Sequence, residues 1–226
     1  MDTLIKQNRQ KHAEKIVTRL RESTRDLPQP AVTQIINEYG KKPFLVLVSC
    51  LLSLRTKDII SLPVSRKLFR FARMPQEILD LSPERLQNII YPTGFYKNKA
   101  RTLRQVSEVL IRDFGGSVPD SERSLLSLPG VGRKTANLVL GEVFGIPAIC
   151  VDTHVHRICN RLGLVNSKTP EQTEQLLQKI LPKKYWIEIN RLLVMWGQSV
   201  CAPISPFCSR CALLDLCPQI GVNKKR

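Results

Sequence analysis

Four of the seven cysteines lie close together near the end of this 226-residue chain, with the spacing C-x6-C-x2-C-x5-C. Thiolates packed this densely suit a soft or borderline metal, and reduced cytosolic thiols favour metal binding over disulfides. Structural zinc usually takes two short cysteine pairs, whereas an iron–sulfur cubane also takes four thiolates. Only one short pair is present, and the spacing alone leaves both metals open. The candidate ligands are Cys201, Cys208, Cys211 and Cys217.

A second candidate site is a tight turn before a predicted helix. The string LPGVGRKTAN places Gly130 and Gly132 two residues apart, just ahead of Lys134. Glycines permit backbone angles closed to other residues and a close approach to a ligand. The free N–H groups and the dipole of the following helix suit a phosphate. An ordinary helix–turn–helix corner explains the same pattern, so local chemistry leaves both interpretations open.

Lys134 lies at or just inside this helix start, where the helix dipole disfavours an ammonium and is expected to lower the lysine pKa. A free amine is a nucleophile, although a solvated lysine at a helix end is the commoner case. Asp152 follows a short apolar run. The predicted helix rises about 16 Å and the eight residues that follow it extend roughly 26 Å, which lets Asp152 return beside Lys134. Asp152, His154 and His156 are alternatively metal ligands, but no further cluster completes such a site.

The charge balance indicates an anionic partner. There are 35 Lys and Arg residues against 19 acidic residues, a formal net charge of +16. Neutralising phosphates releases counterions, so this excess favours nucleic acid. The longest uncharged apolar stretch, residues 43–54, is too short to span a bilayer. The N-terminus lacks the apolar run of a signal peptide, so we expect no membrane association and a cytoplasmic location, at the nucleoid if the source is bacterial or archaeal.

The hydrophobic pattern predicts an all-α fold, because no stretch alternates as a strand would. Ser82 precedes Pro83 at a predicted helix start, and Thr169 opens another helix with capping-box spacing. Cys50, Cys150 and Cys159 are typical of core residues. Further helices are predicted over residues 44–54, 97–114, 134–144 and 184–200, together with a short helix ending at Leu128.

The hairpin string, followed by VDTHVHR, resembles the endonuclease III superfamily of DNA glycosylases. The resemblance extends from about Phe44 to Cys217, and the cysteine spacing is similar to the family's cluster loop. It implies that Lys134 attacks the sugar C1′, that Asp152 assists, and that the four cysteines bind a [4Fe–4S] cluster. The expected DNA contacts on these motifs are Gly130, Val131, Gly132, Arg133 and His154.

The implied enzyme is a bifunctional DNA glycosylase and abasic-site lyase. A damaged base is flipped out of the duplex, Lys134 forms a Schiff base, and β-elimination cuts the strand on the 3′ side. Lysine at this position favours damaged pyrimidines as substrates. Three alternatives stay open: a thymine–guanine or uracil mismatch glycosylase of the same superfamily, a non-catalytic DNA-binding helix-hairpin-helix protein, and a zinc-dependent DNA binder.

Two loops resemble the family's strand-insertion loops. LLSLRTKD carries Arg55 where glutamine often occurs, and GFYKNKA carries Phe95 where an apolar wedge belongs. Arg55 is suited to pairing with an opposing guanine. The family's cluster loop is generally basic between its first two cysteines. Residues 202–207 have no charge here, which argues against a phosphate contact from this loop.

By analogy, the fold has two lobes. A six-helix lobe with the hairpin is expected over residues 36–146. A discontinuous iron–sulfur cluster lobe is expected over residues 1–35 and 147–226. We expect a monomer whose partner is double-stranded DNA containing damaged bases or abasic sites.

Overall fold

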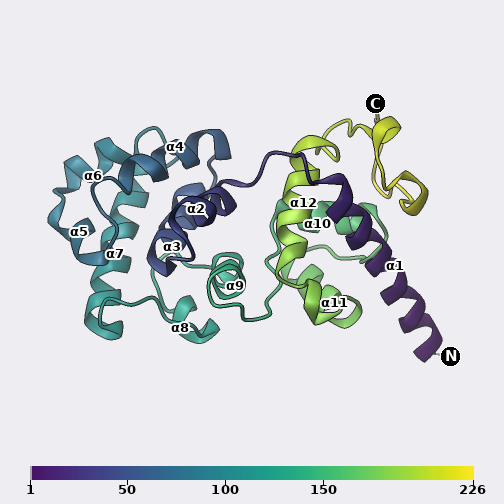
Figure 1. The fold of residues 1–226 in the computed structure, drawn as a ribbon, viewed down its shortest axis with the longest axis horizontal. Helices are drawn as coiled ribbons and strands as arrows, with labels where there is room; N and C mark the ends of the chain where they lie inside the picture. The colour runs from purple at the N-terminus through teal and green to yellow at the C-terminus, as the bar shows by residue number, and fades with distance from the viewer. Residues whose placement is uncertain (1) are drawn as a thin grey trace. The chain divides into compact units, whose positions relative to one another are not determined.

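The computed structural model describes residues 2–226, and within that range it is helical, with no strand (Figure 1). The all-α prediction is therefore confirmed. None of the described helices is both long and apolar enough to cross a bilayer. The α-helices are α1 (Asp2–Ser23), α2 (Ala31–Tyr39), α3 (Pro43–Ser53), α4 (Asp58–Leu68), α5 (Pro75–Asp80), α6 (Pro83–Ile90), α7 (Tyr96–Phe114), α8 (Glu122–Leu126), α9 (Arg133–Glu142), α10 (Thr153–Arg161), α11 (Pro170–Ile180) and α12 (Glu188–Ser199). Three 3-10 turns complete them: η1 (Lys183–Tyr185), η2 (Cys208–Arg210) and η3 (Leu214–Leu216).

The chain folds into two compact units. Met1–Gln29 and Ile146–Arg226 form one of them, which we call the terminal unit. Pro30–Gly145 forms the other, the central unit. The hairpin and Lys134 belong to the central unit, and Asp152 and the four clustered cysteines belong to the terminal unit.

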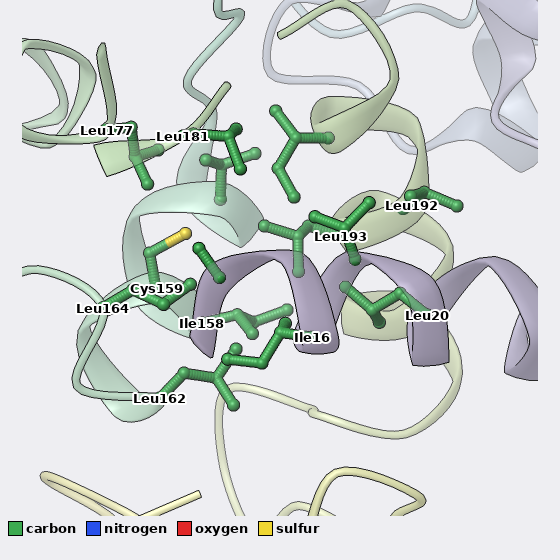
Figure 2. Close-up of a cluster of buried hydrophobic side chains, with 14 of the residues drawn as sticks. Ile16, Leu20, Ile158, Cys159, Leu162, Leu164, Leu177, Leu181, Leu192 and Leu193 are labelled. Carbon is green, nitrogen blue, oxygen red and sulfur yellow. The ribbon is translucent and has the colours of Figure 1, made fainter. Parts of the chain in front are cut away.

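The terminal unit is held together by one face of α1. Ala13, Ile16, Val17 and Leu20 recur every three or four residues, so they lie along one side of that helix, and all are fully or almost fully buried. This side packs against α11 and α12. Figure 2 shows Ile16 and Leu20 among buried side chains of the C-terminal half of the chain. The first helix is thus part of the same core as the segment that leads to the cysteines.

The central unit is built around α3. Residues 44–52 of this helix are all buried, as expected for a helix that is apolar on every side. It contacts α2, α4, α7 and α9. Because α9 begins one residue before Lys134, the packing of α9 on α3 fixes the direction in which the Lys134 side chain points.

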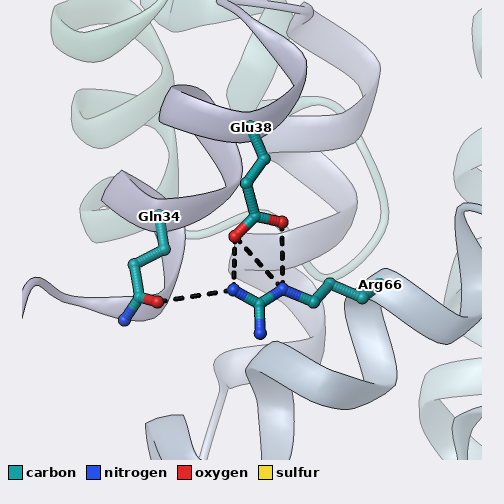
Figure 3. Close-up of polar contacts among 3 residues, drawn as sticks. All are labelled: Gln34, Glu38 and Arg66. Atoms are coloured by element: carbon teal, nitrogen blue, oxygen red, sulfur yellow. Dashed lines mark hydrogen bonds and ion pairs between the residues drawn. The ribbon is translucent and has the colours of Figure 1, made fainter.

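A polar contact joins two outer helices of the central unit (Figure 3). Arg66 of α4 forms an ion pair with Glu38 of α2, with Nε 2.9 Å from Oε2, and its Nη2 lies 3.5 Å from Oε1 of Gln34. The hydrogen-bonded guanidinium lowers the pKa of Glu38. Both partners are partly exposed, so the ion pair contributes little to the free energy of unfolding. Its main effect is to orient α4 on α2.

Several predicted helix ends are confirmed by their capping geometry. The Ser82 hydroxyl accepts a hydrogen bond from the Arg85 N–H at 3.2 Å, at the start of α6. Thr169 does the same for the N–H of Gln172 at 3.3 Å, at the start of α11. Gly115 ends α7 in the left-handed conformation, with φ of 58°.

Three predicted helix bounds were wrong. The helix before the hairpin ends at Leu126 rather than Leu128, α9 ends at Glu142 rather than at residue 144, and α12 begins at Glu188 rather than at residue 184. Before α12, Tyr185 is buried, and the Trp186 indole N–H donates to the Leu181 carbonyl at 2.7 Å. The chain forms the 3-10 turn η1 before α12 begins, because these two aromatic side chains pack against the core.

Candidate active site and cysteine loop

The hairpin is formed by α8, the six-residue connection 127–132 and α9. Leu125, Leu128 and Val131 are buried and pin the turn to the core. No side chain caps the start of α9, and no acidic residue lies in its first turn. The start of α9 is therefore suited to an anion. The Val131 side chain is buried and its N–H donates to the Leu128 carbonyl at 3.1 Å, so any contact from that residue comes from its backbone.

Gly130 is required by the turn for two reasons. Its φ is +72°, a conformation that other residues rarely adopt, and a Cβ there would lie 2.7 Å from Cγ2 of Thr102 on α7. Gly132 differs, because its φ is −97° and a Cβ would meet no atom within 4 Å. The first glycine lets the hairpin approach α7, and the second leaves open space at the helix start.

Lys134 is exposed in the first turn of α9. Its neighbour Arg133 pairs with Glu122 of α8 at 3.0 Å, which ties the two hairpin helices together. On the core side lies Cys50 of α3, a thiol whose pKa is raised to about 12, mainly by burial. The charge of Lys134 acts to lower that pKa, so the lysine lies near Cys50, and the thiol stays protonated and inert.

In the terminal unit, Asp152 caps the N-terminus of α10, a helix that sequence reasoning did not predict. Its Oδ1 accepts from the N–H groups of His154 at 2.9 Å and Val155 at 2.8 Å. Among the described residues, Oδ2 has no hydrogen-bond partner. The carboxylate is therefore fixed through one oxygen while the other stays available.

The two histidines after Asp152 do not form a metal site with it. His156 Nδ1 lies 2.6 Å from the Thr173 hydroxyl, and His154 Nδ1 lies 3.2 Å from Nη2 of Arg157. A Cβ at Gly197 would clash with the His154 ring, so α12 packs closely against it. Within residues 2–226, no group of three or more His, Cys, Asp or Glu side chains is arranged to hold a metal ion.

The two predicted insertion loops lie side by side in the central unit. Arg55 and Phe95 are both exposed, and the Arg55 guanidinium lies 5.7 Å from the Phe95 ring centroid. The Phe95 side chain is 60% exposed, which excludes a role as a core aromatic. Both residues have left-handed backbone angles, with φ of 51° and 57°. Strained non-glycine residues of this kind cluster at functional sites.

Lys99 beneath these loops was missed by sequence reasoning. It is only 8% exposed, and burial lowers its pKa to about 8. The signal was present, because Lys99 falls on the same helix face as Leu103, Val106 and Leu110 of α7, all of which are buried. A lysine on an apolar stripe is unusual enough to indicate a specific partner.

The four clustered cysteines are all partly buried and lie within a winding C-terminal segment. Burial raises the pKa of Cys211 and of Cys217, and the Cys201 and Cys208 thiols raise both values further. The four sulfurs are thus close enough to influence one another electrostatically. The remaining cysteines, Cys50, Cys150 and Cys159, are buried, as predicted for core residues.

Two arginines of α10 hold the start of this segment. Arg161 is buried and donates to the carbonyls of Ala202 at 2.7 Å and Pro203 at 2.6 Å, and its Nη1 lies 3.4 Å from the Cys201 sulfur. Arg157 donates to the Cys201 carbonyl at 2.8 Å. The helix that Asp152 caps therefore also fixes the first cysteine.

Arg226 folds back over the uncharged loop between the first two cysteines. Its N–H donates to the Pro206 carbonyl at 2.8 Å, and its carbonyl accepts from the Ser209 N–H at 2.9 Å. The guanidinium groups of Arg226 and Arg210 each lie 3.8 Å from the Phe207 ring centroid. The loop therefore carries two adjacent cations, one of them from a residue that is distant in sequence.

Comparison with known proteins agrees with this geometry. Residues 48–183 match the family described as HhH-GPD superfamily base excision DNA repair protein. Endonuclease III of Thermotoga maritima is 49% identical over 181 residues, covering 80% of this chain and 85% of that protein. A solved non-covalent endonuclease III–DNA complex is similar, with a TM-score of 0.83 and 33% identity, covering 93% of this chain and 95% of that one. A trapped endonuclease III–DNA covalent intermediate gives 0.77 and 33%, covering 91% and 95%.

The helical fold, the hairpin and the match over residues 48–183 define the class, a base excision DNA repair protein of the HhH-GPD superfamily. Within that class, the chain belongs to the endonuclease III family. The resemblance noted in the sequence is thereby confirmed.

The first prediction concerns the hairpin. Because Gly130 combines positive φ with a close approach to Thr102, Gly130→Ala should lower the free energy of unfolding by about 1–3 kcal/mol. Gly132→Ala is the matched control, and its cost should stay below about 0.5 kcal/mol. Chemical denaturation measures both values, and equal losses would show that the close approach of the turn to α7 does not matter.

Proposed function

We propose that the protein is a bifunctional DNA glycosylase and abasic-site lyase that removes oxidised or ring-damaged pyrimidines from duplex DNA. Lys134 is its nucleophile and Asp152 its catalytic carboxylate. The observation that carries this proposal is the exposed Lys134 in the uncapped first turn of α9. A family relative solved as a trapped covalent intermediate with DNA supports the same chemistry.

The reaction begins when the target nucleotide is flipped out of the helix. The neutral amine of Lys134 forms a bond to C1′, and the bond from C1′ to the damaged base breaks, so the base leaves with the bonding pair and takes up a proton. Opening of the sugar ring leaves an imine between Nζ and C1′. Loss of a C2′ proton then expels the 3′ phosphate by β-elimination, and water releases the lysine.

Asp152 is suited to assist because its two oxygens have different tasks. Oδ1 is held by two backbone N–H groups of α10, which orients the carboxylate. Oδ2 is then available to stabilise positive charge on the sugar or to accept a proton from the Lys134 ammonium. His154, whose N–H binds Oδ1, contacts DNA next to this carboxylate.

The hairpin backbone is the proposed phosphate contact. Gly130 and Gly132 are exposed, and the N-cap residue Gly132 makes no side-chain hydrogen bond to the first turn of α9. Arg133 adds a positive charge beside them. Phosphate contacts of this kind position the duplex without reading its sequence, which suits an enzyme that must find damage in any context.

Borohydride trapping tests the nucleophile. We expect wild-type protein to be reduced onto DNA containing an abasic site, because reduction fixes the imine at Lys134. Lys134→Gln should abolish trapping, whereas Arg133→Gln, which removes the neighbouring charge, should still be trapped. Undiminished trapping of the Lys134 variant would exclude this lysine as the nucleophile.

A substrate panel tests the reaction class in the same assay. Duplexes carrying thymine glycol, dihydrouracil, uracil, a thymine–guanine mispair or an abasic site are compared for strand scission. We expect scission at thymine glycol, dihydrouracil and the abasic site. Activity confined to uracil or the mispair would indicate a mismatch glycosylase, and binding without scission would indicate a DNA-binding module.

The four clustered cysteines are the proposed ligands of a [4Fe–4S] cluster. The pKa of Cys211 is raised in part by Cys217, Cys201 and Cys208, so the four thiols lie near one another, and Arg161 lies 3.4 Å from the Cys201 sulfur. Four thiolates in one winding segment would hold a cubane, with one cysteine to each iron. When bound, the cluster cross-links the C-terminal segment and fixes its loop.

Metal analysis tests this assignment. We expect purified protein to be brown and to contain iron and acid-labile sulfide in equal amounts, because the cubane holds one sulfide per iron. Cys208→Ser should lose both, while Cys150→Ser, a substitution at a core thiol, should retain them. A colourless protein that contains zinc would contradict the assignment.

The terminal unit corresponds to the proposed cluster lobe and the central unit to the hairpin lobe, so each lobe supplies one catalytic residue.

In the cluster lobe, Arg210 and Arg226 lie beside the Phe207 ring, and within the described chain neither pairs with a carboxylate. Two guanidinium groups held on one ring favour an anion, here a DNA phosphate. We place the protein in the cytoplasm, at the nucleoid if its source is bacterial or archaeal, acting as a monomer.

Salt dependence tests the loop contact. The double variant Arg210→Ser, Arg226→Ser should lower the slope of log affinity against log salt by about 2, because each phosphate contact contributes about 0.9. Substituting Lys168 and Lys179, two exposed lysines of the terminal unit, is the matched control with the same charge change. Equal slopes in the two double variants, at equal iron content, would exclude the contact.

A further inference from the structure

Lys99 is a buried cation without an acidic partner in the described part of the chain. Its ammonium donates to the Leu52 carbonyl at 2.6 Å and to the Thr56 hydroxyl at 2.7 Å. Burying a charge is costly, and it is normally offset by an opposite charge. In the described part of the chain, the Lys99 charge is compensated by backbone and hydroxyl oxygens alone. Its contacts therefore call for an explanation other than stability.

The Thr56 hydroxyl is the centre of the arrangement. It accepts from the Lys99 ammonium and from the Gly94 N–H at 3.1 Å, and it donates to the Leu54 carbonyl at 3.3 Å. One donor and two acceptor positions are the full capacity of a hydroxyl. This one group therefore joins both insertion loops to α7.

The loops it joins are tightly matched. A Cβ at Gly94 would lie 2.9 Å from the Arg55 carbonyl oxygen, so the two backbones touch. Arg55 forms this contact, and Phe95 directly follows Gly94. These are the two exposed residues with left-handed backbone angles described above. Two neighbouring strained residues persist only if their surroundings hold them, and the hydrogen bonds of Thr56 are among the contacts that join their loops.

We propose that Lys99 is a positioning residue that, through the Thr56 hydroxyl, holds Arg55 and Phe95 as one rigid unit for joint insertion into a damaged duplex. The inference rests on the proposed role of these two side chains in DNA. A unit ordered before binding loses less conformational entropy on insertion than two independent loops would. Lys99 itself touches no DNA in this account.

The consequence is measurable as coupling between Thr56 and Phe95. The DNA is a duplex with one tetrahydrofuran abasic-site analogue, which binds without reacting, compared with the undamaged duplex and the single strand. Thr56→Val removes the hydroxyl at nearly constant shape and should weaken analogue binding about tenfold. Thr56→Ser keeps the hydroxyl and is the matched control, with a loss of about twofold or less.

The double variant provides the decisive comparison. Phe95→Ala alone should weaken analogue binding, and adding Thr56→Val should cause little further loss, because the hydroxyl acts through the wedge. Lys99→Met should reproduce the pattern of Thr56→Val. Thermal melting of every variant reports whether the fold is retained, and a merely structural role for Thr56 would weaken binding to all three DNAs equally.

The failures of the two ideas are distinct. Losses that multiply in the double variant, or equal losses on analogue and undamaged duplex, would overturn the coupling and leave the wedge assignment standing. A Phe95→Ala variant that binds the analogue as tightly as wild type would overturn the wedge assignment and the coupling with it. Neither result changes the trapping experiment on Lys134, which tests the reaction separately.

Discussion

The N-terminus of α9 is left without a side-chain cap, and the candidate chemistry of the central unit depends on this one feature. Unsatisfied N–H groups at a helix start are unfavourable unless water or a ligand binds them. The buried side chains of Leu125, Leu128 and Val131 hold the turn in place regardless. In the proposed function, a DNA phosphate is the missing cap, and its binding brings a sugar to the same helix turn that presents Lys134.

The start of α10 shows the opposite solution to the same constraint. There a side chain does cap the helix, and that side chain is the carboxylate of Asp152. Using one oxygen for the backbone leaves the other for chemistry, and it fixes the orientation of both. One helix start is thus left open for the substrate, while the other is closed by the residue proposed to act on it.

The parts of this fold that sequence reasoning reached were those determined by local chemistry. Ser82, Thr169 and Gly115 set helix ends because capping involves only residues close in sequence. The hairpin was found for the same reason. The contact between Arg226 and Phe207 and the late start of α12 were not found, because they depend on which distant side chains meet. The proposed catalytic roles of Lys134 and Asp152 came from family resemblance.

Both units use a buried cation satisfied by backbone carbonyls. Lys99 binds the Leu52 carbonyl in the central unit, and Arg161 binds the carbonyls of Ala202 and Pro203 in the terminal unit. A carboxylate partner would neutralise each charge and fix only one side chain. A carbonyl instead fixes the backbone of a loop. The cost of burying these charges is therefore linked directly to the ordering of the loops that the proposed function brings to DNA.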